Sequence, residues 1–450
     1  MQADLSKKDE QFREFSLNGP MWRVVLYVGF PLALYESLNQ LFKILDTMMA
    51  SHIGASAVSA VAYLSQINMM ISAVGTGLAV GASIKVSQAY GAGDFMLVKK
   101  RVSTMFAMCG ALGIAILLVL VPFTPEFLRL MNTPEEFIAD GSTYFRLELF
   151  GMVITFFNNV YIAIERARGN SKRILILNTA VIVVKLGLTA WFVYGLGGGI
   201  NMISCATIIS QSFLLLAACI NMNQKGNAFG FSLRAISIKK EVICPMLTLS
   251  FPVIVERIAF AVGKVIVNSM STVYGSWTVG ALGISNNIGG ITTNPQNGFQ
   301  EGGSSIISQN LGAGRPKRAL LAFRWVLYID MLIGLVIMTA SLLCLNQLAG
   351  LFAGDNAEFA EMIKQIYRFE AVGAIPLGVN AAVMALLYGF GKTRVTLVMN
   401  FCRVFLFRVP VLWALQQFTD LGNVSAGIVM SRTKRLMPER ADKSLALSWR

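Results

Sequence analysis

The chain contains one sequence pattern twice, and this duplication constrains its fold more than any other feature. Residues 81–93 read GASIKVSQAYGAG, and residues 302–314 read GGSSIISQNLGAG. The offset of 221 residues holds without a gap back to Pro31 and Pro252. A repeat of this length predicts two homologous halves rather than one undivided bundle.

The composition places these halves in a lipid bilayer. Apolar residues make up 55% of the chain and charged residues 14%, whereas a soluble domain carries about 25% charged residues. A helix of about 20 apolar residues crosses a bilayer, and long uncharged runs recur along the chain. We therefore predict an all-α integral membrane protein, and a duplicated half in such a chain is typical of membrane transporters. The net charge of +14 is interpreted as basic cytoplasmic loops, so no nucleic-acid partner is expected.

The apolar runs predict about eleven membrane spans. Six are expected in the first half, at residues 21–45, 57–86, 102–122, 143–165, 174–195 and 199–221. Five are expected in the second half, at residues 242–270, 278–311, 320–345, 361–389 and 393–417. The counterpart of the sixth span should begin near Asn423, but the sequence turns into the basic segment 431–435, which cannot cross a bilayer. We therefore predict two six-helix lobes of which the last helix is truncated.

The domain prediction follows these spans. It assigns residues 1–222 to an N-lobe, 223–241 to a cytoplasmic linker, 242–430 to a C-lobe and 431–450 to an atypical basic tail. Basic clusters follow the even-numbered spans, as at Lys99–Arg101, and acidic residues follow spans 3 and 9. Basic loops stay in the cytoplasm, so we predict a plasma (inner) membrane protein with a cytoplasmic N-terminus. Six spans in the first half then predict a pseudo-two-fold axis along the membrane normal.

Three segments together resemble the multidrug and toxic compound extrusion (MATE) family of transporters. They are Asp46–Ala50, the stretch from Gly77 to Gly93, and its second copy, Ser308–Gly314. The resemblance covers roughly residues 20–425. It implies twelve helices in two lobes around a central cleft, and export of bulky, often cationic, amphipathic compounds in exchange for sodium or protons.

The same resemblance sets the expectations for partners and cofactors. We expect a small-molecule substrate, a bilayer environment, a monomer without an obligate protein partner, and no cofactor apart from H⁺ or Na⁺ as the coupling ion. No His-Glu-x-x-His motif, metal cluster or Gly-x-Ser-x-Gly elbow is present in the sequence, so we predict that the protein is not an enzyme.

Charged residues inside the spans are the candidates for ion coupling, because each costs about 2.5–3.5 kcal/mol to insert and needs a partner or a function. The candidates are Asp46, Lys185, Glu256 and Glu370. Asp46 matches the family's first-lobe cation position, but Lys185 and Thr189 stand where the family often has Asn and Asp. We therefore hypothesise an Asp46–Lys185 pair that breaks when Asp46 is protonated; a static salt bridge is the alternative. No metal cofactor is predicted, although Na⁺ binding is possible at Asp46 or Glu256.

Four further charged residues are candidates for a substrate cleft: Glu36, Lys43, Lys264 and Glu301. Lys43 and Lys264 are equivalent in the two halves. Facing a cleft, they would favour anionic or zwitterionic substrates; lying near the outer surface, they would have little effect. Glu301 alternatively caps a helix end.

Ion pairs are the alternative for the carboxylates. Glu256 and Glu370 have possible partners at Arg257, Arg403 and Arg408, and both Arg146–Glu148 and its counterpart Arg368–Glu370 are possible local pairs. The rival functions are a flippase or exporter of lipid-linked or anionic compounds, from a related two-lobe family, and a non-transporting homologue that lacks the last span.

Overall fold

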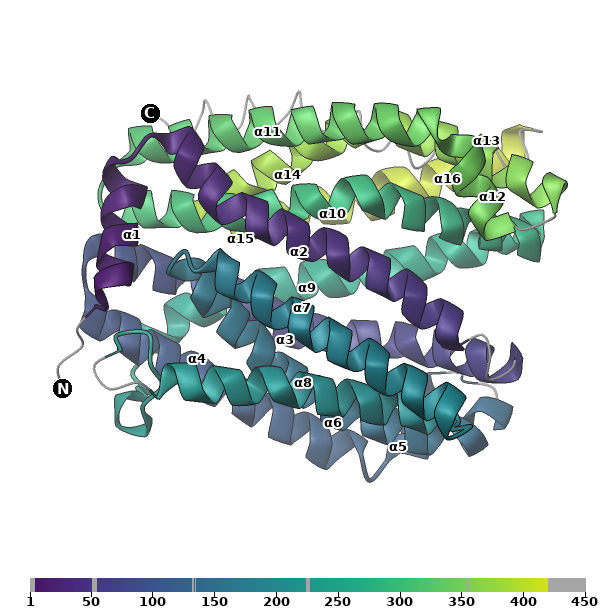
Figure 1. The fold of residues 1–450 in the computed structure, drawn as a ribbon, viewed down its shortest axis with the longest axis horizontal. Helices are drawn as coiled ribbons and strands as arrows, with labels where there is room; N and C mark the ends of the chain where they lie inside the picture. The colour runs from purple at the N-terminus through teal and green to yellow at the C-terminus, as the bar shows by residue number, and fades with distance from the viewer. Residues whose placement is uncertain are drawn as a thin grey trace. The chain divides into compact units, whose positions relative to one another are not determined.

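A computed structural model of the chain describes residues 5–50, 55–131, 133, 135–223, 227–353 and 356–419. The regular elements of this part are helices, drawn in chain order in Figure 1. The first half contains α1 (Lys7–Asn18), α2 (Met21–Ala50), α3 (Ala55–Ala92), α4 (Phe95–Leu120), α5 (Thr124–Leu130), α6 (Glu135–Ala167), α7 (Ser171–Ala190) and α8 (Ile200–Met222). The second half contains α9 (Lys240–Ser271), α10 (Ser276–Gly312), α11 (Pro316–Leu343), α12 (Leu345–Ala353), α13 (Ala357–Val372), α14 (Ala374–Gly389), α15 (Thr393–Phe401) and α16 (Val409–Phe418).

Many of these helices can cross a membrane. Within the described residues, 8 are long and apolar enough, or 9 if α13 and α14, which meet at a bend of 46°, form one span. Helix α10 is 37 residues long but contains many Asn, Gln, Ser and Thr residues, so it is not among them. The predicted remnant of a twelfth span and the basic tail lie outside the described residues.

Both copies of the repeated pattern end a long helix at a glycine in the left-handed conformation. Helix α3 ends before Gly93, and α10 ends before Gly314, with φ angles of 82° and 72°. Only glycine adopts this left-handed conformation without strain. Asp94 then caps α4 by accepting a hydrogen bond from the Leu97 amide, at 2.9 Å. Each copy of the repeated pattern therefore ends one long helix and starts the next.

The described chain forms two compact units. Unit 1 comprises Met1–Gly19, Leu41–Ile258 and Ser308–Arg315, and unit 2 comprises Pro20–Gln40, Ala259–Ile307 and the chain from Pro316 onward. Helices α2, α9 and α10 each contribute to both units. The predicted division into lobes at residues 222 and 242 stays a prediction.

The glycines of the repeated helices explain this exchange of segments. In unit 1, a Cβ atom on Gly77 of α3 would lie 2.7 Å from the Ile254 side chain of α9. In unit 2, Gly298 of α10 lies equally tightly against Ala33 of α2. These two contacts occupy equivalent places in the repeat. The helix that carries the repeated pattern in each half thus packs closely on the first long helix of the other half, as small residues allow.

Candidate functional site

The structure places most of the predicted site residues inside the helices. Glu256 on α9 and Glu370 on α13 are buried, each with 7% of its surface exposed. Four others are half-buried in α2, α7, α9 and α10: Glu36, Lys185, Lys264 and Glu301. Lys43 and Asp46 lie on α2, but their side chains are outside the described residues, so the Asp46–Lys185 pair stays a prediction.

Glu370 is held between α13 and α10 of unit 2. Its Oε2 atom accepts a hydrogen bond of 2.6 Å from the Ser285 hydroxyl. Gly289 lies one turn further along α10, where a Cβ atom would be 2.8 Å from Oε1. The positive charge of Arg408 also acts on Glu370. This carboxylate therefore has a hydroxyl donor and a nearby guanidinium, while Arg368, its predicted local partner, is exposed on α13.

Glu148 occupies the equivalent position in unit 1. Its Oε1 atom accepts a hydrogen bond of 2.8 Å from Ser204 of α8, and its Oε2 atom lies 3.4 Å from Asn68 Nδ2 of α3. Asn68 is the counterpart of Gly289 in the repeat. Each half therefore directs one carboxylate at the same turn of its repeated helix.

Uncharged polar side chains form a second cluster in unit 2, and reasoning from the sequence missed it. Gln40 of α2 donates from Nε2 to the Asn287 carbonyl at 3.2 Å, and its Oε1 accepts from Asn294 at 3.0 Å. Gly290 makes room for the amide. The cost of inserting a charge does not identify uncharged amides, so this cluster was not predicted, although α10 contains several Asn residues.

Asp330 is the second residue that the sequence analysis missed. It lies within α11 with none of its surface exposed, inside the predicted span 320–345. The rule that singled out Glu256 and Glu370, the free-energy cost of a charge inside a span, applies equally to it.

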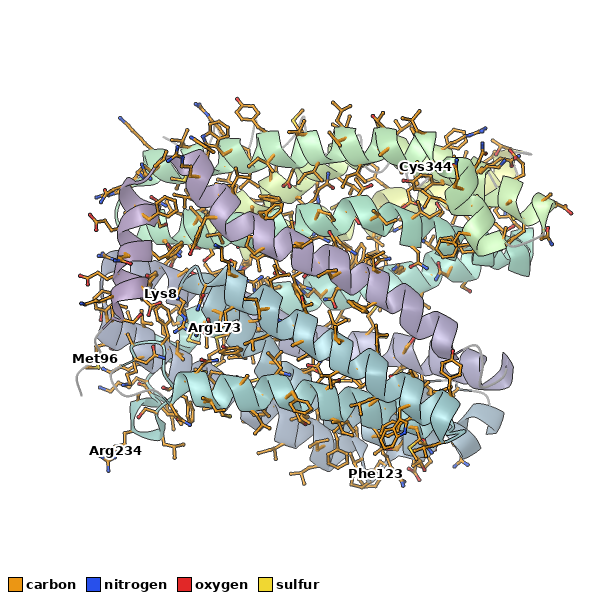
Figure 2. The ribbon with its side chains drawn as sticks, in the orientation of Figure 1. Lys8, Met96, Phe123, Arg173, Arg234 and Cys344 are labelled. Atoms are coloured by element: carbon orange, nitrogen blue, oxygen red, sulfur yellow. The ribbon has the colours of Figure 1, made fainter. Side chains whose placement is uncertain are left out.

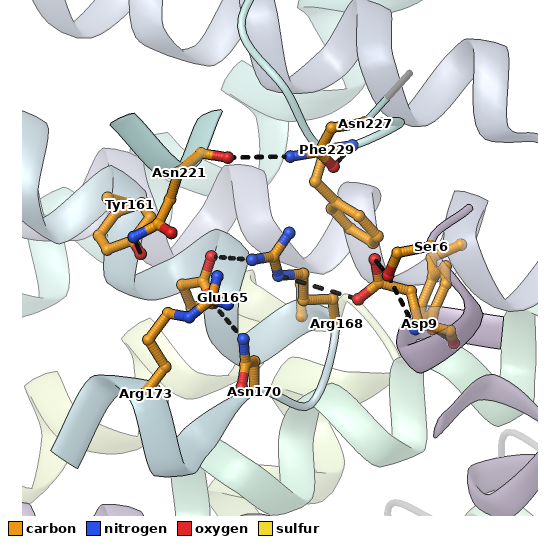
Figure 3. Close-up of polar contacts among 12 residues, drawn as sticks. Ser6, Asp9, Tyr161, Glu165, Arg168, Asn170, Arg173, Asn221, Asn227 and Phe229 are labelled. Carbon is orange, nitrogen blue, oxygen red and sulfur yellow. Dashed lines mark hydrogen bonds and ion pairs between the residues drawn. The ribbon is translucent and has the colours of Figure 1, made fainter. Parts of the chain in front are cut away.

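An ionic cluster at the end of α6 anchors the N-terminal helix of unit 1 (Figure 3). Arg168 Nη2 lies 2.5 Å from Glu165 Oε1, and Arg168 Nε lies 3.9 Å from Asp9 of α1. Arg173 and Asn170 also contact Glu165, at 3.5 Å and 2.9 Å. Glu165 is buried, so its charge is balanced by two guanidinium groups.

Helix α1 contacts both copies of the repeated pattern. Arg13 donates to the carbonyls of Tyr90 and Gly91, at 3.0 and 2.9 Å, and Ser16 donates to Gln309 Oε1 at 2.8 Å. Gly91 itself lies against the Gln309 backbone. In the ribbon, α1 runs crosswise to α4 and α8 (Figure 1). The N-terminal helix therefore fastens the ends of the two repeated segments within unit 1.

Three basic residues of unit 1 lie at one of its ends. Figure 2 shows Lys8, Arg173 and Arg234 at this end of the unit and Phe123 at the opposite end. The cytoplasmic location of the basic loops stays a prediction.

The paired halves, each with a carboxylate that contacts or faces its repeated helix, match a known family. The MatE family model matches residues 31–191 and 252–414. The chain belongs to the MatE family. It is therefore a multi-pass MATE multidrug efflux transporter and not an enzyme, since the family is non-enzymatic.

Two curated relatives have similar lengths. The probable multidrug resistance protein YoeA of Bacillus subtilis (strain 168) is 24% identical over 409 residues, which are 89% of this chain and 88% of YoeA. The multidrug export protein MepA of Staphylococcus aureus (strain NCTC 8325 / PS 47) is 22% identical over 433 residues, which are 95% of this chain and 94% of MepA.

Solved structures confirm the MATE fold over nearly the whole chain. An outward-facing multidrug resistance MATE transporter of the MOP superfamily aligns with a TM-score of 0.90 at 20% identity, covering 99% of this chain and 100% of that one. A MOP superfamily transporter from Pyrococcus furiosus, described as having a binding pocket of reverse polarity, also gives 0.90 at 20% identity, with 98% and 99% covered.

Proposed function

We propose that this MATE transporter exports amphipathic organic-cation drugs or toxins in exchange for H⁺ or Na⁺, by alternating access of its two lobes. The relatives named for multidrug resistance and multidrug export support the substrate class. We further propose that it acts as a monomer in the cell membrane with its N-terminus in the cytoplasm. The gathering of Lys8, Arg173 and Arg234 at one end of unit 1 supports that orientation.

One observation carries the proposed coupling: the burial of Glu370 between α10 and α13. A buried carboxylate is expensive to keep charged, so binding a cation or proton changes its free energy strongly. The Ser285 hydroxyl donates a hydrogen bond to Glu370 Oε2. An ion that binds Glu370 must compete with this contact. Such competition makes ion binding prefer one conformation, which is the requirement for coupling to a substrate.

Transport into vesicles tests this proposal. Purified protein in proteoliposomes should transport a cationic fluorescent dye when a proton gradient or a sodium gradient is imposed, with the ion and the dye moving in opposite directions. We expect Glu370→Gln to reduce gradient-driven transport by about tenfold or more. Asp46→Asn and Glu256→Gln, assayed alongside, separate coupling in the first half from coupling in the second. Wild-type protein that moves no dye under either gradient would refute ion-coupled export of cations.

A second function, transport of anionic or lipid-linked compounds, is favoured by the half-buried lysines Lys185 and Lys264. The reversed pocket polarity described for the Pyrococcus furiosus protein provides a precedent in the same fold. The same proteoliposomes, loaded with an anionic dye or a fluorescent anionic lipid, distinguish the two functions. Lys264→Gln should then slow anion transport and leave cation transport unchanged.

A further inference from the structure

Asp330 is a fully buried carboxyl group without a hydrogen-bond partner. It lies on α11 of unit 2 with 0% of its surface exposed. Neither Oδ1 nor Oδ2 has a hydrogen-bond partner among the described residues. Polar groups that are buried in native proteins are nearly always hydrogen-bonded, and an isolated buried carboxylate is the most expensive exception.

Three helices of unit 2 meet around this residue, and we call the place the Asp330 junction, defined by Gln296, Asp330, Gly334, Ala374 and Gly378. Gln296 of α10 donates from Nε2 to the backbone carbonyls of Asp330 and Ala374, at 3.0 and 3.1 Å. A Cβ atom on Gly378 of α14 would lie 2.6 Å from the Asp330 carbonyl. Figure 1 shows α14 beside α11. The backbones thus approach closely enough to exclude bulky side chains.

A third acceptor in the junction also lacks a donor. Gln296 is buried at 1% exposure, and its Oε1 atom has no hydrogen-bond partner in the described part of the chain. Together with the two Asp330 oxygens, it makes three acceptors without a donor. A proton on Asp330 would turn one of these acceptors into an O–H donor and remove the negative charge.

Asp330 forms no ion pair with any residue that the structure describes. Its two carboxyl oxygens are buried, and none of the described titratable groups on the helices packed around it contacts them. Those groups, among the described residues, are Glu301 on α10, Lys317, Arg318, Arg324 and Tyr328 on α11, Glu358, Glu361, Lys364, Tyr367, Arg368 and Glu370 on α13, and Tyr388 on α14. A salt bridge therefore does not explain the residue.

Packing does not explain it either, because unit 1 builds the same junction without it. Helices α4 and α11 start at equivalent positions, so Cys109 is the counterpart of Asp330, and Gly75 is the counterpart of Gln296. Phe156 is the counterpart of Gly378, and its ring fills the space beside Gly75. Cys109 is as fully buried as Asp330. Residues without a charge or an amide are thus sufficient to pack this junction. The presence of Asp330 and Gln296 in unit 2 is therefore not explained by packing.

The Asp330 junction is linked to the Glu370 site through two shared elements. Gln296 lies two turns along α10 from Gly289, which faces Glu370, so both are on the same side of that helix. Ala374, which accepts from Gln296, follows Glu370 across the bend between α13 and α14. A movement at this bend would therefore change the surroundings of both carboxyl groups.

We propose that Asp330 is a proton-binding site of unit 2. Its carboxyl group carries a proton in the present structure and releases it to water as a free proton, leaving a carboxylate, when the junction opens. The proposal rests on the ion-coupled export proposed above and identifies the coupling ion as the proton. It adds to Glu370 a second group that is charged in one state of the transport cycle and neutral in another.

Infrared difference spectroscopy on the full-length protein in lipid nanodiscs tests the proton directly. Wild-type protein at neutral pH should show the carbonyl stretch of a protonated, dry carboxyl group, and Asp330→Asn should remove that band. Cys109→Ala, at the equivalent place in unit 1, should keep it. A spectrum that Asp330→Asn leaves unchanged, or a wild-type band that sodium ions rather than pH abolish, would overturn the proposal.

Transport in proteoliposomes tests the consequence. Asp330→Asn should lower proton-driven dye export by about tenfold or more while dye binding stays within about twofold of the wild type. Asp330→Cys, which installs the residue of unit 1, should behave likewise and guards against a folding defect of the Asn variant. Proton-driven export at the wild-type rate in either folded variant contradicts the proposal. If the wild type exports nothing under either gradient, the proposed function fails, and the infrared band still decides whether Asp330 holds a proton.

Discussion

The junction of α3, α4 and α6 in unit 1 and the junction of α10, α11 and α14 in unit 2 have the same construction and opposite chemistry. In unit 1 a glycine on the repeated helix, Gly75, receives the ring of Phe156. In unit 2 the sizes are exchanged, since Gln296 fills the space beside Gly378. Gly113 and Gly334 allow close approach at equivalent places in both. The two junctions thus share a packing geometry, while only the junction of unit 2 contains a buried acid in the described part of the chain.

The largest effect is expected when the junction of unit 2 receives only one of the residues found at the equivalent places in unit 1. Gly378→Phe places a ring where Gln296 and the Asp330 carbonyl already lie, within 2.8 Å of the glycine's Cβ position. Overpacking of this kind, together with two lost hydrogen bonds, should destabilise the protein by on the order of 3 kcal/mol. Size-exclusion chromatography and thermal melting in detergent measure the loss. Folded protein at wild-type yield would show that the junction is loosely packed.

Converting all three residues of the unit 2 junction to those of unit 1 should restore folding but not transport. The triple variant Gln296→Gly, Asp330→Cys and Gly378→Phe converts unit 2 to the arrangement of unit 1. We expect most of the stability to return, because the ring then enters the space that glycine leaves, as Phe156 does beside Gly75. Proton-driven export should stay about tenfold or more below the wild type. A triple variant that folds and exports normally would mean that the polar junction has no functional role.

The two carboxylates of the repeat offer a milder test. Ser285→Ala removes the donor to Glu370, and Ser204→Ala removes the donor to Glu148. A hydrogen bond to a charged group contributes about 1.5–3 kcal/mol. We expect Ser285→Ala to lower gradient-driven transport and Ser204→Ala to lower the melting temperature alone. Equal losses of transport in the two variants would assign coupling to both halves.

The smallest effects concern α1, which contacts the two copies differently. Arg13→Ala removes two hydrogen bonds to the first copy, and Ser16→Ala removes one to the second. The expected losses of stability are about 1–2 and about 1 kcal/mol, respectively. Melting temperatures of the two single variants and of the double variant would show whether the contacts act independently. The reverse order of the two losses would show that the second copy depends more on α1.

Much of this fold is predictable from the sequence, because the repeat and hydropathy act through simple rules. Gly93 and Gly314 follow the ends of their helices in the left-handed conformation, and Gly77 and Gly298 allow close helix contacts. The partner of each contact was not predictable. Ala33 and Ile254 are equivalent in the repeat, so Gly77 could in principle pack on the first helix of either half. Sequence equivalence alone does not distinguish these pairings, and packing of the whole chain decides between them.

The sequence predicts candidate site residues where a charged side chain lies inside a membrane span. Glu256 and Glu370, which the cost of inserting a charge identified as candidates, are buried in the structure, and their role in coupling stays a prediction. Gln40 and Gln296 were missed because an amide carries no charge, and its importance depends on which backbone carbonyls come within reach. Asp330 differs from both amides, because its charge makes the same insertion argument apply to it.

Each junction draws its neighbours from within its own unit, and this independence has an evolutionary consequence. A duplicated gene encodes each packing arrangement twice. One copy can therefore accept substitutions that introduce new chemistry while the packing of the other copy is unchanged. Cys109 and Asp330 record the two fates of one ancestral position. Comparison of the two halves of a single polypeptide can therefore reveal specialised residues.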